Sequence, residues 1–312
     1  MNNYENKVAV ITGGTSGLGY AFAELLGKAG AKIVITGRRE ELGFKAEAAL
    51  KEMGIDVMYV QQDVTVEADW DNLLKTVIGT YGRIDYAFNN AGVMARPKPG
   101  MKLTMKDWDW VLDTNIHGTL YGLRKFTGAM MMQPDGGHII TTASTASIAP
   151  FSMWGPYSVS KAAVLRLVET FKGEMLLGKV TKIQYCVSLP GVFESDVSNG
   201  TCYRSEKYRN PGEQDVVAPT SKAHTPDGDK LGMITAEETA QIIIDQMEAG
   251  KFYIYTHEDL SLSLLPEQFK SMQNEQGLTD QAIFDFAFYA KKLQAQGIDA
   301  GASHLQNMTQ KA

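Results

Sequence analysis

The segment Lys7-Val-Ala-Val-Ile-Thr-Gly-Gly-Thr-Ser-Gly-Leu-Gly-Tyr20 decides the fold of this 312-residue chain. Its apolar, β-branched first half predicts a buried strand that ends at Thr12, and a helical pattern follows at residues 18–29. The junction holds the key glycines Gly13, Gly17 and Gly19. Glycine allows positive φ there and lets backbone N–H groups approach a pyrophosphate, which a helix N-terminus also attracts. The segment therefore predicts a dinucleotide-binding turn, although its spacing differs from Gly-x-Gly-x-x-Gly; a flexible turn is the alternative.

The rest of the chain alternates short β-branched runs with longer amphipathic segments. Expected strands lie at residues 7–12, 32–36, 57–61, 84–88, 138–142, 182–188 and 252–255. Expected helices lie near residues 18–29, 40–53, 67–80, 107–130, 157–177 and 236–249. This alternation predicts an α/β fold: a doubly wound parallel sheet (Rossmann fold) of about seven strands flanked by helices, with ligands at the carboxyl ends of the strands. No repeat or linker marks a boundary, so we expect one domain over residues 1–312, with its core at about 5–258.

Composition excludes several other classes of function. A formal net charge of −6 argues against a nucleic-acid or anionic-membrane partner. Cys186 and Cys202 have no metal-ligand spacing, and neither do the five histidines, so no metal site is expected. The start of the chain shows no signal sequence, which predicts a cytoplasmic protein. Residues 136–160 lack acidic, lysine and arginine side chains but are rich in Ser, Thr, Gly and Pro, which indicates a site and not a membrane span.

A tyrosine near the end of that uncharged stretch and the lysine that directly follows the stretch can act together. If Pro156 lies in the first turn of a helix, Tyr157 and Lys161 lie one turn apart on the same face. A phenol with a pKa of about 10 is a poor acid at neutral pH, and a fixed cation nearby can lower that pKa. Ser144 follows a buried strand thirteen residues upstream of Tyr157 and can supply a hydroxyl to the same point. For Ser144 alone, a loop serine that satisfies backbone groups is the alternative.

The end of the second strand indicates the choice of cofactor. An acid there would bind both ribose hydroxyls of NAD(H), whereas an arginine favours the 2′-phosphate of NADP(H). Gly37 stands at the acid position and is followed by Arg38 and Arg39, so NADP is favoured over NAD. The acids at 40–41 could instead neutralise these arginines, and Arg39 could be a surface charge.

Two further strand ends carry candidate cofactor contacts. Asp63 and Val64 could cap the adenine, or Asp63 could cap a turn. Asn89-Asn-Ala-Gly92 forms a patch of small residues where the backbone can pass close to a ligand, or a tight turn held by asparagine hydrogen bonds.

Taken together, four motifs occur in a characteristic order. They are Thr12-Gly-x-x-x-Gly-x-Gly19, Asn89-Asn-Ala-Gly92, a helical Asn115, and Ser144 with Tyr157-x-x-x-Lys161. Over residues 7–195 the chain resembles the single-domain branch of the short-chain dehydrogenase/reductase family.

The resemblance implies hydride transfer between a nicotinamide and a carbonyl or alcohol carbon. Tyr157 would protonate the developing alkoxide, and Ser144 would hydrogen-bond the same oxygen. Lys161 would bind the nicotinamide ribose and depress the tyrosine pKa. Asn115 would support a water chain to the lysine. The expected catalytic residues are therefore Asn115, Ser144, Tyr157 and Lys161.

The expected cofactor contacts run along the same edge of the sheet. They are Gly13, Thr15, Ser16, Gly17, Leu18, Gly19, Arg38, Arg39, Asp63, Val64, Asn90, Ala91, Gly92, Tyr157, Lys161, Pro190, Gly191 and Ser195. Ser195 stands where the family often has a threonine that binds the nicotinamide carboxamide. The resemblance also implies a homodimer or homotetramer that assembles through the helices bearing Asn115 and Tyr157.

The remaining segments are expected to serve the substrate and the surface. The polar stretch at about 194–232 predicts a substrate lid, with a surface insertion as the alternative. Met94, Arg96, Phe151, Met153 and Trp154 are candidate pocket residues for a fairly large apolar or aromatic carbonyl or alcohol substrate, and Arg96 could meet an anionic group. Residues 259–312 predict a helical C-terminal extension, with an apolar stripe at Ile283, Phe286, Ala290 and Leu293.

Two other functions stay open at this point. One is an NAD-linked alcohol dehydrogenase of the same fold. The other is an NADP-binding sensor or scaffold without turnover, which the intact set of Ser144, Tyr157 and Lys161 disfavours.

Overall fold

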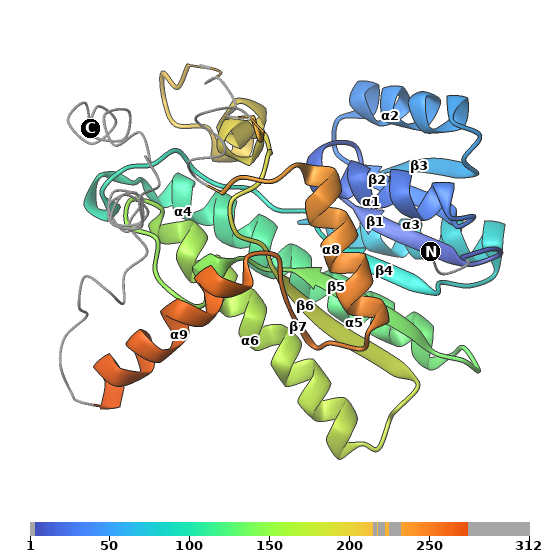
Figure 1. Cartoon of the computed structure of the whole chain (residues 1–312). Helices are drawn as coiled ribbons and strands as arrows, with labels where there is room; N and C mark the ends of the chain where they lie inside the picture. Colours follow the sequence, from blue (N-terminus) through green and yellow to red (C-terminus); the bar gives the residue numbers. More distant parts are fainter. Residues whose placement is uncertain (1–3, 215–216, 218–221, 225–231, 274–312) are drawn as a thin grey trace.

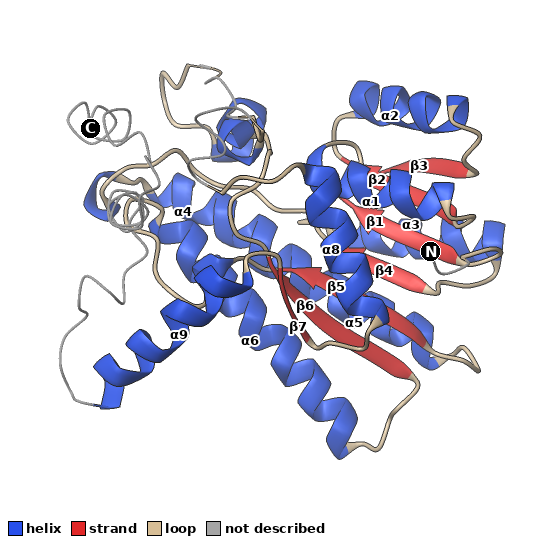
Figure 2. Cartoon of the chain, viewed as in Figure 1, coloured by secondary structure: helices blue, strands red, loops and turns tan. Residues whose placement is uncertain are grey.

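The computed structural model describes residues 4–214, 217, 222–224 and 232–273. They contain a seven-stranded parallel sheet in the order β3-β2-β1-β4-β5-β6-β7, which confirms the expected doubly wound fold (Figures 1 and 2). The strands are β1 (Val8–Thr12), β2 (Lys32–Gly37), β3 (Val57–Gln61), β4 (Tyr86–Asn89), β5 (Gly137–Thr142), β6 (Ile183–Leu189) and β7 (Tyr253–Tyr255). Strand order reverses between β1 and β4, and in such sheets ligands bind at this switch point.

Helices cover both faces of the sheet. They are α1 (Gly17–Lys28), α2 (Glu40–Glu52), α3 (Glu67–Tyr81), α4 (Met105–Leu112), α5 (Gly118–Met131), α6 (Gly155–Leu177), α8 (Ala236–Glu248) and α9 (Glu258–Gln273). Shorter helical turns are η1 (Gly100–Lys102), η2 (Asp113–His117), η3 (Thr145–Ser147), η4 (Val197–Tyr203) and η5 (Glu206–Tyr208). The helix expected at 107–130 is therefore divided into α4 and α5 by the π-helical turn η2.

Strand β1 shows how the sheet is buried on both sides. Val8 and Val10 belong to the apolar cluster that includes residues of α3, α5 and α6. Ala9 and Ile11 belong to the cluster that includes residues of α1, α2 and α8. Because every residue of such a strand faces apolar neighbours, its sequence is a continuous apolar run and not an alternation.

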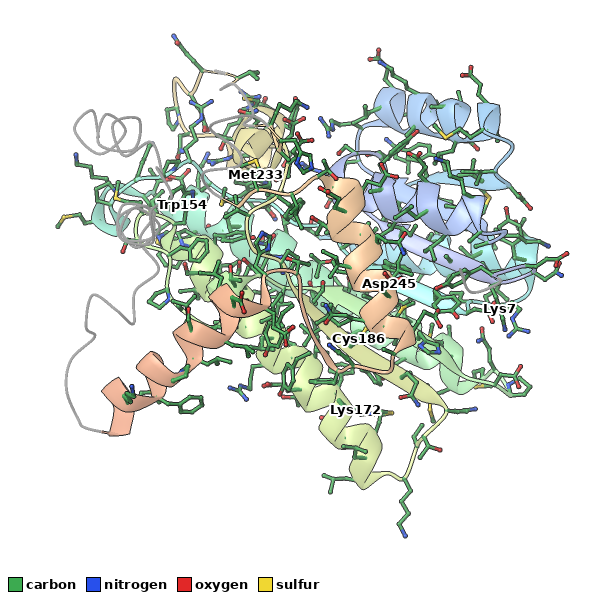
Figure 3. The ribbon with its side chains drawn as sticks, in the orientation of Figure 1. Lys7, Trp154, Lys172, Cys186, Met233 and Asp245 are labelled. Carbon is green, nitrogen blue, oxygen red and sulfur yellow. The ribbon has the colours of Figure 1, made fainter. Side chains whose placement is uncertain are left out.

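The loops that follow the strands gather at one end of the molecule. Figure 3 marks the two ends: Lys7 precedes β1 at the amino ends of the strands, whereas Trp154 and Met233 lie toward the opposite side. The turn after β1, residues 90–104 after β4, residues 143–154 after β5 and residues 190–214 after β6 all begin at this carboxyl edge. Candidate residues far apart in the sequence are therefore brought together there.

The C-terminal part is described only as far as Gln273. Helix α9 begins near α6 and runs away from it (Figure 1), and Leu264 on α9 is buried in the cluster that includes α6. The predicted apolar stripe at 283–293 lies outside the described residues, as do parts of the predicted lid. No helix within the described ranges combines the length and apolarity needed to cross a membrane.

Candidate active site

Hydrogen bonds from Thr12 join the ends of two strands at the centre of the site. The Thr12 hydroxyl oxygen accepts hydrogen bonds from the backbone N–H groups of Asn90 (2.9 Å) and Ala91 (3.1 Å). The Asn90 side-chain amide donates to the Thr12 carbonyl (3.0 Å), and its oxygen accepts from the Thr142 hydroxyl (3.2 Å). We call these contacts the Thr12–Asn90 clasp. It fixes the turn after β1 against the ends of β4 and β5.

The glycine turn has the geometry of an anion-binding helix start. Gly13 and Gly17 have positive φ, +66° and +53°. A Cβ at Gly19 would lie 2.2 Å from the Gly13 carbonyl oxygen, so only glycine fits there. Within the described residues, the side chain of Ser16 makes no capping hydrogen bond to α1. The first N–H groups of the helix thus have no side-chain cap, as a pyrophosphate-binding turn requires.

The neighbouring predicted contacts are mostly supporting residues. Thr15 is buried, and its methyl carbon would lie 3.0 Å from a Cβ at Gly37. Leu18 is buried in the apolar cluster between α1 and the sheet. Val64 is buried against Gly118, where a Cβ would approach it to 2.8 Å.

Arg38 and Arg39 stand at the end of β2, where the sequence predicts the adenosine ribose. Arg38 donates a 2.9 Å hydrogen bond to the carbonyl of Tyr203 and lies 3.8 Å from a carboxylate oxygen of Asp63. The guanidinium of Arg39 lies 4.0 Å from the centre of the Tyr203 ring. The other oxygen of Asp63 accepts from the backbone and hydroxyl of Thr65, so Asp63 does cap a turn, the alternative that its sequence context left open.

Three contacts anchor the described part of the predicted lid. Tyr203 lies against the two arginines, and Arg204 donates to Asp107 on α4 (2.7 Å). Tyr208 donates to Asp113 in η2 (2.6 Å). Sequence reasoning missed all three, since nothing in a polar, aperiodic stretch indicates which distant partner each side chain meets.

The expected catalytic residues meet where β5 ends and α6 begins. Pro156 lies in the first turn of α6, as predicted, and the Lys161 amine lies 5.7 Å from the centre of the Tyr157 ring. Lys161 donates to the Thr142 carbonyl at 2.8 Å. Ser144 lies close enough to the Tyr157 phenol to lower its pKa, and its hydroxyl oxygen accepts from the backbone N–H of Ala146 (3.1 Å). A hydroxyl, a phenol and an amine are thus brought together.

Burial controls the ionisation of this cluster. Burial raises the pKa of Tyr157, and the Ser144 side chain opposes that rise only in part. Burial also lowers the pKa of Lys161 to about 8. The expected depression of the tyrosine pKa is therefore not produced by these residues alone, because the desolvated lysine is turned toward the Thr142 carbonyl.

Asn115 positions the neighbouring backbone. Its side chain pairs with both backbone groups of Val93, at 2.8 and 2.9 Å, and donates to the Ser160 hydroxyl at 2.9 Å. Ser160 in turn donates to the Tyr157 carbonyl. A Cβ at Gly92 would lie 3.4 Å from both the Asn115 oxygen and the Lys161 amine. The π-turn η2 is the local irregularity that aims this asparagine inward, and such turns are frequent at functional sites.

The segment after β6 closes the site. The Pro190 carbonyl accepts from the N–H of Thr145 (3.0 Å), and Gly191 donates to the Thr256 hydroxyl (3.1 Å). A Cβ at Gly191 would lie 2.5 Å from the His257 ring, so no side chain fits there. Ser195 is partly buried at the start of the lid. No group of three metal-ligating side chains occurs among the described residues.

The comparisons with known proteins agree with this geometry. The family model described as short chain dehydrogenase matches residues 7–202. An uncharacterized oxidoreductase of Staphylococcus epidermidis is 32% identical over 229 residues, which cover 72% of this chain and 95% of that protein. A C alpha-dehydrogenase of a Sphingobium species is 27% identical over 260 residues, 83% of each chain. A crystal structure of a short chain dehydrogenase/reductase from Burkholderia phymatum in complex with NAD superimposes with a TM-score of 0.80 at 27% identity, covering 90% of this chain and 99% of that one.

Replacing Gly19 with alanine should abolish tight cofactor binding without unfolding the protein. The new methyl group would overlap the Gly13 carbonyl and displace the turn. We expect NADPH and NADH to bind at least about tenfold more weakly, measured by nucleotide fluorescence. The control is Gly128→Ala on α5, where no atom lies within 4 Å of the new Cβ. Equal affinities in both variants would contradict the assigned turn.

The buried lysine predicts an unusual pH dependence of stability. Unfolding raises the pKa of Lys161 from about 8 to 10.5, so the cost of burying its charge is complete below pH 8 and disappears as the pH rises toward 10.5. Relative to Lys161→Met, the free energy of unfolding of the cofactor-free protein should rise by about 2 kcal/mol between about pH 7 and about pH 9.5. Urea denaturation at the two pH values measures this.

The control for this measurement is Lys172→Met, farther along the same helix (Figure 3). The pH dependence of the free energy of unfolding of Lys172→Met should match that of the unmodified protein. An identical pH dependence in the unmodified protein and in Lys161→Met would show that the lysine is not desolvated.

Proposed function

The chain belongs to the short-chain dehydrogenase/reductase family and is an NAD(P)-dependent oxidoreductase, and we propose that it transfers a hydride between NADP(H) and a carbonyl or alcohol carbon of an apolar or aromatic substrate. The observation that carries the proposal is the convergence of Ser144, Tyr157 and Lys161 at the carboxyl edge of the sheet. Their place beside the uncapped start of α1 supports a dinucleotide as the second reactant.

In the reducing direction the protein supplies a proton and a polarised site. When bound, the nicotinamide supplies the hydride. Tyr157 donates its phenolic proton to the developing alkoxide; burial raises its pKa, so the phenol is protonated at neutral pH. Ser144 donates a hydrogen bond toward the same oxygen. In the oxidising direction the Tyr157 phenolate accepts the alcohol proton.

Lys161 completes the proton path. With a pKa of about 8, it can both hold and release a proton near neutral pH. The Thr142 carbonyl fixes the direction of the amine. Asn115 acts as a positioning residue, since its side chain holds Val93 and Ser160 and touches neither Tyr157 nor Lys161 through any hydrogen bond in the described structure.

Three features support NADP(H) and an apolar substrate. Arg38 and Arg39 stand at the end of β2, where Gly37 replaces an acid. One carboxylate oxygen of Asp63 accepts a hydrogen bond from the backbone N–H of Thr65 within a turn, so only the other oxygen is turned toward Arg38. Phe151 and Met153 flank the start of α6 in the loop after β5. NAD(H) is the competing cofactor, because the similar Burkholderia phymatum structure is a complex with NAD.

The single-domain organisation over 1–312, the lid at 194–232, the assembly as a homodimer or homotetramer and the cytoplasmic location stay predictions. Contacts of Ser195 with a carboxamide and of Pro190, Gly191 and Asn90 to Gly92 with a dinucleotide are part of the same proposal.

Replacing Tyr157 with phenylalanine tests the proposed reaction. Absorbance of the reduced nicotinamide, followed with a panel of ketones, aldehydes and alcohols, should show turnover that falls about 10²- to 10⁴-fold in the variant. The dissociation constant of NADPH should not change. Tyr121→Phe is the control, because Tyr121 also precedes a lysine by four residues but lies on α5. Undiminished turnover in Tyr157→Phe would exclude this tyrosine as the acid.

Replacing Arg38 with aspartate tests the cofactor. The ratio of kcat/KM for NADPH to that for NADH should fall at least about tenfold, because a carboxylate repels the 2′-phosphate and binds the ribose hydroxyls. The charge-matched control is Arg166→Asp, on the 79% exposed Arg166 side chain of α6. An unaltered ratio in Arg38→Asp would refute this assignment of the ribose site.

A further inference from the structure

A cavity lies between the loops that follow β4 and β6. It has a volume of about 390 Å³ and is enclosed by the loop after β4, the start of α4 and the segment from η4 to residue 214. That volume is within the range of small-molecule sites and would hold roughly a dozen water molecules. Its polar lining consists mainly of Arg96, Lys98, Asp107, Thr201, Arg204 and Glu213. None of these residues belongs to the catalytic cluster or to the glycine turn.

Two residues of the cavity lining each carry a buried polar atom without a hydrogen-bond partner among the described residues. The Arg204 side chain is only 1% exposed; its Nη1 donates to Asp107, and its guanidinium lies 4.4 Å from the Trp110 ring centre. Its Nε is buried without a hydrogen-bond partner among the described residues, and so is the hydroxyl of Thr201. An unpaired buried polar group costs free energy, so such groups usually have a partner in water or a ligand. Both residues line the cavity, and a small side-chain shift would give each of these covered atoms a partner in a ligand that accepts hydrogen bonds.

The charges of the lining favour an anion of single charge. Arg96, Lys98 and Arg204 are cations, and Asp107 and Glu213 are carboxylates, which leaves one positive charge in excess. Burial tends to raise the pKa of Asp107, but hydrogen bonds from Thr104 and Arg204 hold it below its usual value, so Asp107 is ionised.

Both carboxylates already have partners. Asp107 accepts from Arg204 and Asn210, and Glu213 accepts from the N–H of Asn210 at 3.0 Å. The Lys98 amine makes no hydrogen bond or ion pair with the described residues. An organic carboxylate carries the matching charge, whereas a phosphate monoester carries about −1.5 to −2.

The loop after β4 connects this cavity to the catalytic residues. Gly92 faces Asn115 and Lys161, and Arg96 is four residues farther along, so their Cα atoms are at most roughly 14 Å apart. The Lys98 backbone donates to the Met153 carbonyl at 2.9 Å, four residues before Tyr157. A single elongated molecule can therefore reach both places.

We infer that this cavity binds the carboxylate of the substrate, so that the enzyme acts on carbonyl or hydroxy acids whose reacting carbon and carboxylate are separated by an apolar spacer. The inference rests on the proposed function and names its substrate class. Arg204 and Thr201 turn their unpaired donors to the carboxylate when it binds, and Lys98 balances its charge. Leu103, in the same lining, faces the spacer.

Binding of a carboxylate can be measured without turnover. Isothermal titration of the full chain, at constant ionic strength, compares 4-phenylbutyrate with its neutral amide and with inorganic phosphate. We expect the acid to bind at least about tenfold more tightly than the amide or phosphate. Lys98→Met and Thr201→Val should remove this preference, whereas Lys75→Met, which deletes an exposed charge on α3, should keep it. Arg204 is left intact because its removal would strand Asp107 as a buried, unpaired charge.

Kinetics then test whether the bound carboxylate belongs to the substrate. With reduced cofactor, 3-benzoylpropionate should have a KM at least about tenfold below that of its methyl ester. Lys98→Met should raise KM for the acid by about the same factor, while kcat and the KM of the ester stay unchanged. A rise in the KM of the acid alone indicates lost recognition of the carboxylate, whereas a general loss of structure would also change kcat and the KM of the ester.

The outcomes separate the two proposals. If acid and ester are reduced with equal KM in every variant, the inference is overturned while the proposed function stands. If phosphate binds as tightly as the acid, the cavity is a site for free anions and the inference is also overturned. If the acid binds in a manner that depends on Lys98 and Thr201 but neither compound is turned over, the carboxylate site is supported and the proposed function fails.

Discussion

The Thr12–Asn90 clasp is the constraint on which the site depends. A parallel sheet aligns the carboxyl ends of its strands, but it does not by itself fix the position of one loop relative to the next. Hydrogen bonds between Thr12 and the backbone of Asn90 and Ala91 fix this position for the loops after β1 and β4. Thr142 links the same contacts to β5. The same Thr142 carbonyl directs Lys161. The glycine turn and the Lys161 amine are therefore placed by one connected set of contacts.

Desolvation sets the ionisation of the proposed catalytic cluster. Burial raises the pKa of Tyr157, which keeps the phenol protonated but makes it a weaker acid, and a lysine with a pKa of about 8 is poised between its two forms near neutral pH. Both shifts have burial as their largest cause. The cluster destabilises the fold slightly, as functional sites commonly do, because a buried lysine costs free energy while it is charged.

Much of the fold and of this cluster could be predicted from the sequence, because the signals are local. The glycines at 13, 17 and 19 and the spacing of Tyr157 and Lys161 each report on one turn of chain, and strand-helix alternation fixes the type of sheet. The π-turn at η2 could not be predicted, since it depends on Asn115 pairing with Val93, 22 residues upstream. The role of Asp63 was ambiguous, because a carboxylate after a strand can cap a turn or bind a ligand equally well.

The described part of the predicted lid shows why the remaining contacts could not be predicted. Arg204 meets Asp107 across 97 residues, and Arg38 meets Tyr203 across 165. Nothing in a polar stretch without periodicity encodes such pairs locally. The sequence therefore predicted a lid, but neither the contacts that hold its described part nor the cavity beside them.

Transfer of deuterium is the most direct measurement of whether the glycine turn and the catalytic cluster serve one reaction. The reduced cofactor carries deuterium at both C4 positions of the nicotinamide, and the alcohol formed from an aromatic ketone is analysed by NMR. We predict one deuterium on the carbinol carbon for each cofactor oxidised. Alcohol without deuterium at that carbon, or no oxidation of the cofactor by any carbonyl compound tested, would contradict the assignment.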